Sequence, residues 1–257
     1  MKNYFCALMM GVSLVVPVAT ITADQPKKQS AEELRLGARV LEVLMDSHGV
    51  YETISPQKVQ DLQAAAGKLT QLGLLGRMLS GDLLKKMPVF TKVTNLQIAE
   101  AVDEGTLQQL PRCFPNVETL MLTYASPLKP DSIGYLSSMA KLKGIILVDL
   151  GSKNAETFCA TDETCQLIGK DFPHLTQLVV TLVSSNTIAI TDAGIEALIP
   201  LTELKTLVLN PCEVSDQGLQ VIGDNFPALQ ELTIKSKKIS PTALSALSKK
   251  RPKLHVK

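Results

Sequence analysis

The side chains best suited to nucleophilic, redox or metal chemistry in this chain are five cysteines and three histidines. They are Cys6, Cys113, Cys159, Cys165, Cys212, His48, His174 and His255. A nucleophilic thiol needs a base beside it, and the sequence places no base near Cys165 and no carboxylate or thiol at a useful spacing from any histidine. Glycine-rich phosphate loops, His-Glu-x-x-His and Gly-x-Ser-x-Gly motifs are also absent from the sequence. The sequence therefore predicts a protein that is not an enzyme and that holds no metal or cofactor.

The composition also argues against nucleic acid as a partner. The net charge is +1 with 20% charged residues, whereas a dedicated nucleic-acid binder normally has a basic excess. Aromatic residues make up 4% of the chain and Trp is absent, so few side chains could stack on bases. Hydrophobic residues make up 45% of the 257, which is enough for a long core.

Residues 1–23 resemble a signal peptide in their pattern. Lys2 supplies a positive start, a nearly continuous apolar stretch follows, and Ala23 provides the small residue at the end. The alternative is an uncleaved anchor, because the apolar stretch is close to the length that spans a bilayer. Pro17 and the polar Thr20 and Thr22 favour cleavage. We expect an exported protein, periplasmic or secreted, without a stable membrane span.

Residues 93–257 repeat one pattern of apolar residues. Each unit opens with an apolar residue and has two more at the third and fifth positions after it, which is typical of a short strand with one buried face. The units begin at Val93, Val117, Leu142, Leu175, Leu204, Leu229 and Leu254. A strand and a helix that recur every 24 to 33 residues cannot bury their apolar faces alone, so the units must stack.

The second half of each unit shows an independent helical pattern. An apolar or Cys residue lies nine or ten positions before each next unit, and a helix-capping residue type precedes it by four. The predicted N-caps are Asp103, Thr161, Thr191, Ser215 and Ser240. Lys129 breaks the set, but Pro130 follows it at a position that suits the start of a helix.

These units resemble the leucine-rich repeat superfamily. The segments 190–195 (ITDAGI) and 214–219 (VSDQGL) are similar to the cysteine-containing, GALA-like repeats of F-box-associated and bacterial proteins. At the position of the superfamily's Asn/Cys ladder only Cys212 fits. The resemblance covers about two thirds of the chain and implies an α/β horseshoe that binds other proteins, with a parallel concave sheet and convex helices. Together with the signal peptide, it suggests a bacterial protein.

Residues 24–92 are predicted to be a helical N-terminal cap. Ser30 and Glu33 form a capping box for a first helix, and Ser55 and Pro56 open a second, which we expect to end at Ser80. Residues 82–87 can form one more short helix. The alternative is an adaptor head like that of F-box proteins, but the Leu-Pro opening and late Trp of such heads are missing.

The repeat register also assigns the cysteines. Cys165 occupies a slot that other units fill with Ile195 and Leu219, so we expect a buried thiol. Cys113 lies on the opposite rim from Cys212, too far away to form a disulfide. A bridge between Cys159 and Cys165 remains open as an alternative in an exported protein.

A partner site is expected on the concave face, where side chains alternate with those of the core. The middle of this face is apolar, although the fold does not require it, and polar residues edge it. The candidate residues are Met121, Thr123, Ile146, Val148, Val179, Thr181, Val208 and Asn210. The alternative is that these residue types reflect strand propensity alone.

The third and fourth units carry insertions between strand and helix, on one rim of the solenoid. Stacked insertions often bind partners, although tolerated surface loops are an equally good interpretation. The candidate residues are Asp149, Lys153, Asn154, Glu156, Ser184, Ser185 and Asn186. The basic C-terminal end is interpreted as a solvated cap, with attraction to anionic lipid or wall polymer as the alternative.

The sequence therefore predicts an exported, monomeric leucine-rich repeat protein that binds a protein or peptide. The alternative function is that of a host-directed effector or substrate-recruiting adaptor, with the helical head as the docking element.

Overall fold

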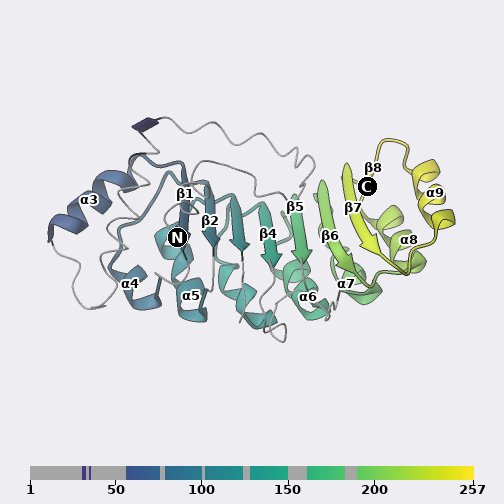
Figure 1. Cartoon of the computed structure of the whole chain (residues 1–257), viewed down its shortest axis with the longest axis horizontal. Helices are drawn as coiled ribbons and strands as arrows, with labels where there is room; N and C mark the ends of the chain where they lie inside the picture. Colours follow the sequence, from purple (N-terminus) through teal and green to yellow (C-terminus); the bar gives the residue numbers. More distant parts are fainter. Residues whose placement is uncertain are drawn as a thin grey trace, which may run out of the picture.

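The structure is a computed structural model, and it describes residues 31, 32, 35, 56–75, 79–99, 102–123, 128–149, 161–182 and 190–257. Eight strands form one sheet in chain order, and every neighbouring pair is parallel. The strands are β1 (Gln71–Leu75), β2 (Asn95–Ala99), β3 (Thr119–Thr123), β4 (Gly144–Asp149), β5 (Gln177–Leu182), β6 (Thr206–Cys212), β7 (Glu231–Ser236) and β8 (His255–Val256). Figure 1 shows them side by side from one end of the molecule to the other.

A helix follows each of the first seven strands, and α3 precedes β1. The helices are α3 (Pro56–Ala66), α4 (Gly81–Lys86), α5 (Glu104–Cys113), the 3-10 helix η2 (Pro130–Leu136), α6 (Asp162–Asp171), α7 (Asp192–Ala197), α8 (Asp216–Asn225) and α9 (Pro241–Lys250). Helices α4 to α8 lie along one side of the sheet, and α9 lies at the far end beside β8 (Figure 1). Every N-cap residue predicted in the repeats is confirmed, and Lys129 takes this position in η2 without a side-chain hydrogen bond. The caps predicted at Ser30 and Ser55 lie outside the described residues.

The core lies between the sheet and the helices, and the predicted strand register is confirmed. Leu207 and Leu209 of β6 are fully buried, and they pair in register with Leu178 and Val180 of β5. The phenylalanines that end α5 and α8, Phe114 and Phe226, are also fully buried. Phe90 stacks on Phe114 with ring centroids 5.1 Å apart, which links the first units. The chain is thus an α/β leucine-rich repeat solenoid.

The prediction of a wholly helical head is wrong at residues 71–75. Residues 71–75 form β1, and Leu72 and Leu74 pair in register with Leu96 and Ile98 of β2. The segment from Leu69 repeats the strand pattern 24 residues before Val93, and Gly73 is a poor helix former. Pairing with β2 satisfies the backbone groups that a continued helix would have satisfied. The sheet therefore begins one unit earlier than predicted.

Ser80 begins α4 instead of ending a helix, because its hydroxyl accepts a hydrogen bond from Leu83 N at 3.1 Å. The short helix predicted over residues 82–87 is confirmed by α4. Of the first predicted helix, residues 31, 32 and 35 are helical, and Glu32 forms an ion pair with Lys68 at 2.9 Å. Residues 1–23, and with them the predicted signal peptide, lie outside the described residues. Within the described part of the chain, no helix has the length and apolarity needed to cross a membrane.

Candidate binding face

The concave face of the sheet is built from the side chains that alternate with the core residues along each strand. Parallel pairing aligns equivalent positions, so Met121, Ile146, Val179 and Val208 lie next to one another across β3 to β6. Neighbouring strands are about 4.8 Å apart, so these side chains contact each other across the sheet. The structure therefore brings the predicted concave residues together in one row.

This row forms an apolar cluster that is separate from the main core. Ile146, Val148 and Val179 make up the cluster, and Met121 and Val208 pack against it while remaining half-buried. The prediction of an exposed stripe is therefore wrong at its centre, where Ile146 is 9% and Val179 2% exposed. Close packing of large side chains on adjacent strands contributes to this burial. The cluster reaches the surface at its two ends, Met121 and Val208.

The next row toward the strand ends is more buried than expected as well. Thr123, Val148 and Thr181 are each below a tenth exposed, and only Asn210 of the predicted row is half-buried. The hydroxyl of Thr123 is buried without a hydrogen-bond partner among the described residues. A buried hydroxyl without a partner costs about 1–3 kcal/mol of stability.

Gln177 is a polar residue of this face that the sequence did not single out. Its side chain lies over Gly144 of the neighbouring strand, since a Cβ placed at Gly144 would be 3.1 Å from Gln177 Oε1 and 3.2 Å from Thr119 Oγ1. Gln177 is 5% exposed, and its Nε2 has no hydrogen-bond partner in the described part of the chain. Gly144 was the indication of this contact in the sequence, because a glycine in a strand often marks a close approach by another group.

The more accessible part of the concave face lies on β6 and β7. Val208, Asn210, Glu231 and Thr233 are half-buried there, and Lys235 is exposed. The predicted rim insertions lie largely outside the described residues. Of the candidates in them, Asp149 belongs to the end of β4, and Lys153, Asn154, Glu156, Ser184, Ser185 and Asn186 are not described.

The opposite side of the sheet has a ladder of carboxylates that joins consecutive helices. Asp162 in the first turn of α6 accepts hydrogen bonds from Thr191 N and Thr191 Oγ1, both at 2.7 Å. Asp192 accepts in the same way from Ser215 N, at 2.8 Å, and from Ser215 Oγ. Asp216 accepts from the N and Oγ of Ser240, both at 2.7 Å. Each rung ties the first turn of one helix to the N-cap of the next.

The ladder explains the Thr/Ser-Asp-x-Gly motif of the repeats. A Cβ placed on Gly194 would be 2.4 Å from Asp162 Oδ1, and one on Gly218 would be 2.2 Å from Asp192 Oδ1. Glycine is therefore needed at these positions to leave room for the carboxylate of the preceding unit. The motif therefore has a structural role in the solenoid.

The three described cysteines are free, buried thiols. Burial raises the pKa of the Cys165 thiol to about 12, and the nearby charge of Asp162 adds to the effect. Burial also raises the pKa of Cys113 and Cys212. The buried slot predicted for Cys165 is confirmed, whereas the bridge to Cys159, which is outside the described residues, is not formed by this free thiol. A neutral buried thiol is a poor nucleophile.

His174 does have a carboxylate partner, contrary to the sequence prediction. Its Nδ1 lies 2.9 Å from Glu203 Oε1, and both side chains are mostly exposed. The two residues are 29 positions apart and occupy equivalent places immediately before Leu175 and Leu204. The pair is exposed, and the described residues contain no group of three or more side chains that could hold a metal ion.

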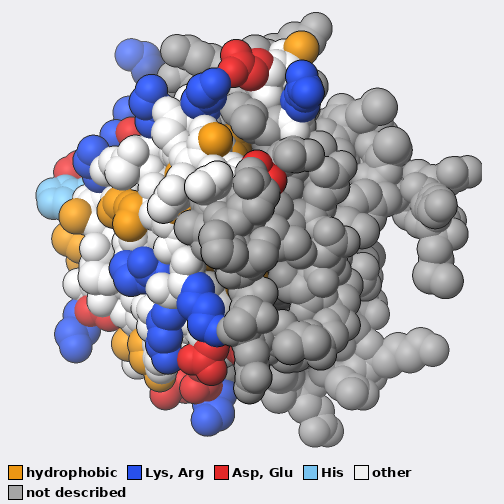
Figure 2. Space-filling view, turned by 90° about the vertical axis from the view of Figure 1, so that its left-hand side faces the viewer, with side chains coloured by type: hydrophobic (Ala, Val, Ile, Leu, Met, Phe, Trp, Pro, Cys, Tyr) orange, Lys and Arg blue, Asp and Glu red, His pale blue; other side chains and the backbone are white. Residues whose placement is uncertain are grey.

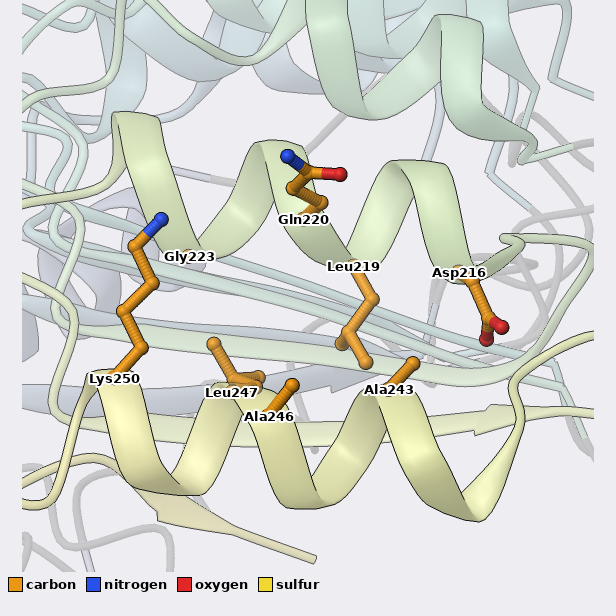
Figure 3. A pocket seen from close by; sticks show the side chains of 8 residues that line it. All are labelled: Asp216, Leu219, Gln220, Gly223, Ala243, Ala246, Leu247 and Lys250. Carbon is orange, nitrogen blue, oxygen red and sulfur yellow. The ribbon is translucent and has the colours of Figure 1, made fainter.

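A groove of about 340 Å³ separates α8 from α9. Leu219 and Leu247 lie between the two helices, with Asp216 at one end and Lys250 at the other (Figure 3). Both charged groups are already engaged, Asp216 by Ser240 and Lys250 by Asp224. The groove therefore offers a ligand an apolar floor and no free charge.

Similarity to known proteins is found among solved structures. No family model matches the chain, and no curated protein matches it. Among solved structures, a chain of the Rad7 and Elc1 complex in yeast is similar, with 15% identity and a TM-score of 0.46, over 88% of this chain and 68% of that one. A leucine-rich repeat protein of Leptospira interrogans is also similar, with 11% identity and a TM-score of 0.21, over 84% of this chain and 97% of that one.

Proposed function

We propose that this protein is an exported, non-enzymatic leucine-rich repeat protein that binds a protein or peptide on the concave face of its sheet. The observation that carries the proposal is the apolar cluster of Ile146, Val148 and Val179, which is separate from the core and reaches the surface at Met121 and Val208. The fold needs a buried apolar face only toward the helices. Of the apolar side chains on the other face, Met121 and Val208 are half-buried and can therefore contact a partner.

The surroundings of the cluster suit an extended polypeptide. Val208 gives a half-buried apolar contact, and Asn210 and Thr233 beside it offer hydrogen-bonding groups. An apolar centre with a polar rim is the usual composition of a protein interface. The described cysteines and histidines support the non-enzymatic part of the proposal, since the thiols are buried and His174 faces only Glu203.

Site-specific photo-crosslinking in cells tests the proposed face. A photoreactive amino acid replaces Val208 or Thr233 on the concave side, and Val221 or Ser245 on the helices serves as the control position. Val221 is matched to Val208 in residue type and is half-buried like it. We expect one defined crosslinked protein from the concave positions and none from the controls. Crosslinks only from the helical positions would overturn the proposed face.

The partner found in this way allows a quantitative test. Val208→Asn should weaken its binding at least about fivefold, since each of the few central contacts that dominate an interface contributes more than about 1 kcal/mol. Val221→Asn should leave binding unchanged. Export is tested separately by N-terminal sequencing of the protein from its native cells. A mature N-terminus at Asp24 supports export, and an intact Met1 with the protein in the cytoplasm contradicts it.

A further inference from the structure

The last unit of the chain has a strong excess of positive charge. Residues 229–257 contain eight Lys and Arg residues and one carboxylate, Glu231, for a net charge of +7. The whole chain carries +1, so the remaining 228 residues carry −6. At the end of the molecule where α3 lies, Figure 2 shows Lys and Arg side chains interspersed with Asp and Glu. The positive charge is thus concentrated at one end of the solenoid.

Half of these eight cationic residues interact with other groups of the protein: Lys238, Lys250, Arg251 and Lys257. Lys238 pairs with Glu213 at 3.0 Å, and Lys250 pairs with Asp224. Arg251 donates to four backbone carbonyls, those of Gly223, Phe226, Pro227 and Leu229, and so closes the end of α8. The Arg251 guanidinium therefore stabilises the fold.

Four lysines of the last unit remain without a counter-charge. Lys235, Lys237, Lys249 and Lys253 are exposed, and the described structure gives none of them an ion pair or a side-chain hydrogen bond. Fold stability does not explain four unpaired ammonium groups at one end, because a polar terminal unit could use both signs of charge. They form the unpaired set discussed below.

The unpaired set spans the whole end of the solenoid. Lys235 and Lys237 lie at the end of β7 and in the turn after it, which is the rim where strands lead into helices. Lys249 is in the last turn of α9, and Lys253 follows it before β8, on the opposite rim. A narrow linear ligand on one rim would contact only half of the set. A broad negative surface could attract both rims together.

The last unit also lacks the groups that anchor a protein or a nucleic acid. Residues 227–257 contain no Phe, Tyr or Trp, and their only arginine is Arg251. Protein interfaces obtain most of their affinity from Trp, Tyr and Arg, and single-stranded nucleic acids need aromatic side chains for stacking. Flexible, exposed lysines without anchors match a fluid surface of anionic headgroups, which requires charge and no fixed geometry.

We propose that the last unit, through Lys235, Lys237, Lys249 and Lys253, docks the solenoid end-on against an anionic lipid bilayer. Each lysine near such a surface strengthens binding about fivefold at physiological salt. The attraction decays within a Debye length of about 8 Å, so the set acts only when this end faces the membrane. This orientation leaves the concave face open to the side.

Vesicle co-sedimentation of the full-length protein tests the proposal. One set of vesicles contains phosphatidylcholine with about 30% phosphatidylserine, and the other contains phosphatidylcholine alone. The neutral vesicles measure what the apolar residues 1–23 contribute, because that contribution does not depend on headgroup charge. The test variant is K235E/K237E/K249E/K253E. The control variant, K92E/K141E/K170E/K205E, makes the same charge change at four other exposed lysines and also includes one lysine in the last turn of a helix.

We expect the wild type to bind anionic vesicles more tightly than neutral ones, and raised salt to remove the difference. The test variant should lose at least about 25-fold in affinity for anionic vesicles, which corresponds to two lysines. The control variant should lose less than about threefold in affinity for anionic vesicles, which is a third of that effect on a logarithmic scale, because its lysines lie elsewhere on the surface.

Equal losses in the two variants would show that only net charge matters and would overturn the proposal. Equal binding to neutral and anionic vesicles would do the same. Duplex DNA serves as a competitor, and displacement from anionic vesicles at equal charge concentration would assign the surface to polyanions in general and contradict the lipid assignment. Circular dichroism of both variants must match the wild type, and a matching fold with unchanged vesicle binding also refutes the proposal.

Discussion

The carboxylate ladder predicts that Asp192 stabilises the solenoid through the next unit, and Asp192→Ala tests this. The change removes two hydrogen bonds, from Ser215 N at 2.8 Å and from Ser215 Oγ. Hydrogen bonds to a charged acceptor contribute about 1.5–3 kcal/mol each when buried. Asp192 is half-buried, so water can partly replace it. We therefore expect a loss of about 2 kcal/mol in the free energy of unfolding, below the sum for two buried bonds.

Two further variants separate the parts of this interaction. Asp192→Asn keeps an acceptor for Ser215 N but loses the charge, so about 1 kcal/mol should be lost. Ser215→Ala removes the hydroxyl that bonds Asp192 and also accepts from Gln217 N at 3.1 Å, which should cost about 1 kcal/mol. The double variant Asp192→Ala/Ser215→Ala should lose less than the sum of the single variants, with a coupling energy of about 1 kcal/mol.

Urea unfolding followed by circular dichroism measures these differences. The slope of the transition must stay constant, because solenoids can lose cooperativity when one interface is weakened. Asp131→Ala is the control, since Asp131 is an exposed carboxylate in the first turn of η2 and makes no contact of this kind in the described structure. The change in the free energy of unfolding in Asp131→Ala measures the helix-dipole effect alone, which is about 0.5 kcal/mol. If Asp131→Ala costs as much as Asp192→Ala, or if the coupling energy is zero, the ladder does not join the units as argued.

Three further predictions follow from the same structure. Gly218→Ala should lower the free energy of unfolding in urea by about 2 kcal/mol, because its Cβ would lie 2.2 Å from Asp192 Oδ1, and the loss should be smaller in an Asp192→Ala background. Gly73→Ala should not destabilise the protein, because a Cβ at Gly73 has nothing within 4 Å. Hydrogen bonds from the backbone N–H and then the hydroxyl of Ser240 lower the pKa of Asp216, so its stabilising effect is present above the ordinary aspartate pKa and is lost as pH falls through the lowered value. NMR titration should show this pKa rising in Ser240→Ala, and an unchanged pKa would contradict the contribution of the hydroxyl. Because burial raises the pKa of Cys165 to about 12, iodoacetamide at pH 8 should label this thiol only after denaturation, and labelling of the native protein, read by mass spectrometry, would refute the burial. The free energy of unfolding should fall as pH rises above the ordinary thiol pKa, where only the unfolded thiol ionises.

The repeat register was predictable because two separate patterns agree on it. The strand pattern places Leu207 and Leu209 on the buried side, and the capping pattern independently starts a helix after Ser215. The prediction was wrong at β1. The apolar spacing of Leu62, Ala66 and Leu69 is helical, and Leu72 and Leu74 of the strand follow it without a break in the pattern. Local spacing alone could not show where one period ends, because Leu69 fits both. The partner strand β2 decides the outcome.

The side-chain contacts between units were missed for a different physical reason. His174 and Glu203 are 29 residues apart, and Asp192 and Ser215 are 23 apart, so neither pair has a spacing that a search for local motifs would find. In a solenoid, however, neighbours across units are the residues at equivalent positions in the repeat, whatever the length of the insertions between them.

The same rule explains the candidate site. Once Met121, Ile146, Val179 and Val208 are aligned as equivalent positions, their contact is predictable, but their exposure is not. Exposure depends on the size of the neighbours on both adjacent strands and on everything that packs over the sheet, and a single unit contains neither kind of information. Thr233, which follows Val208 in this row on β7, is half-buried, so the apolar cluster ends where the residue type changes. The concave face is therefore divided into a buried centre and an accessible part on β6 and β7, and this division places the crosslinking test at Val208 and Thr233.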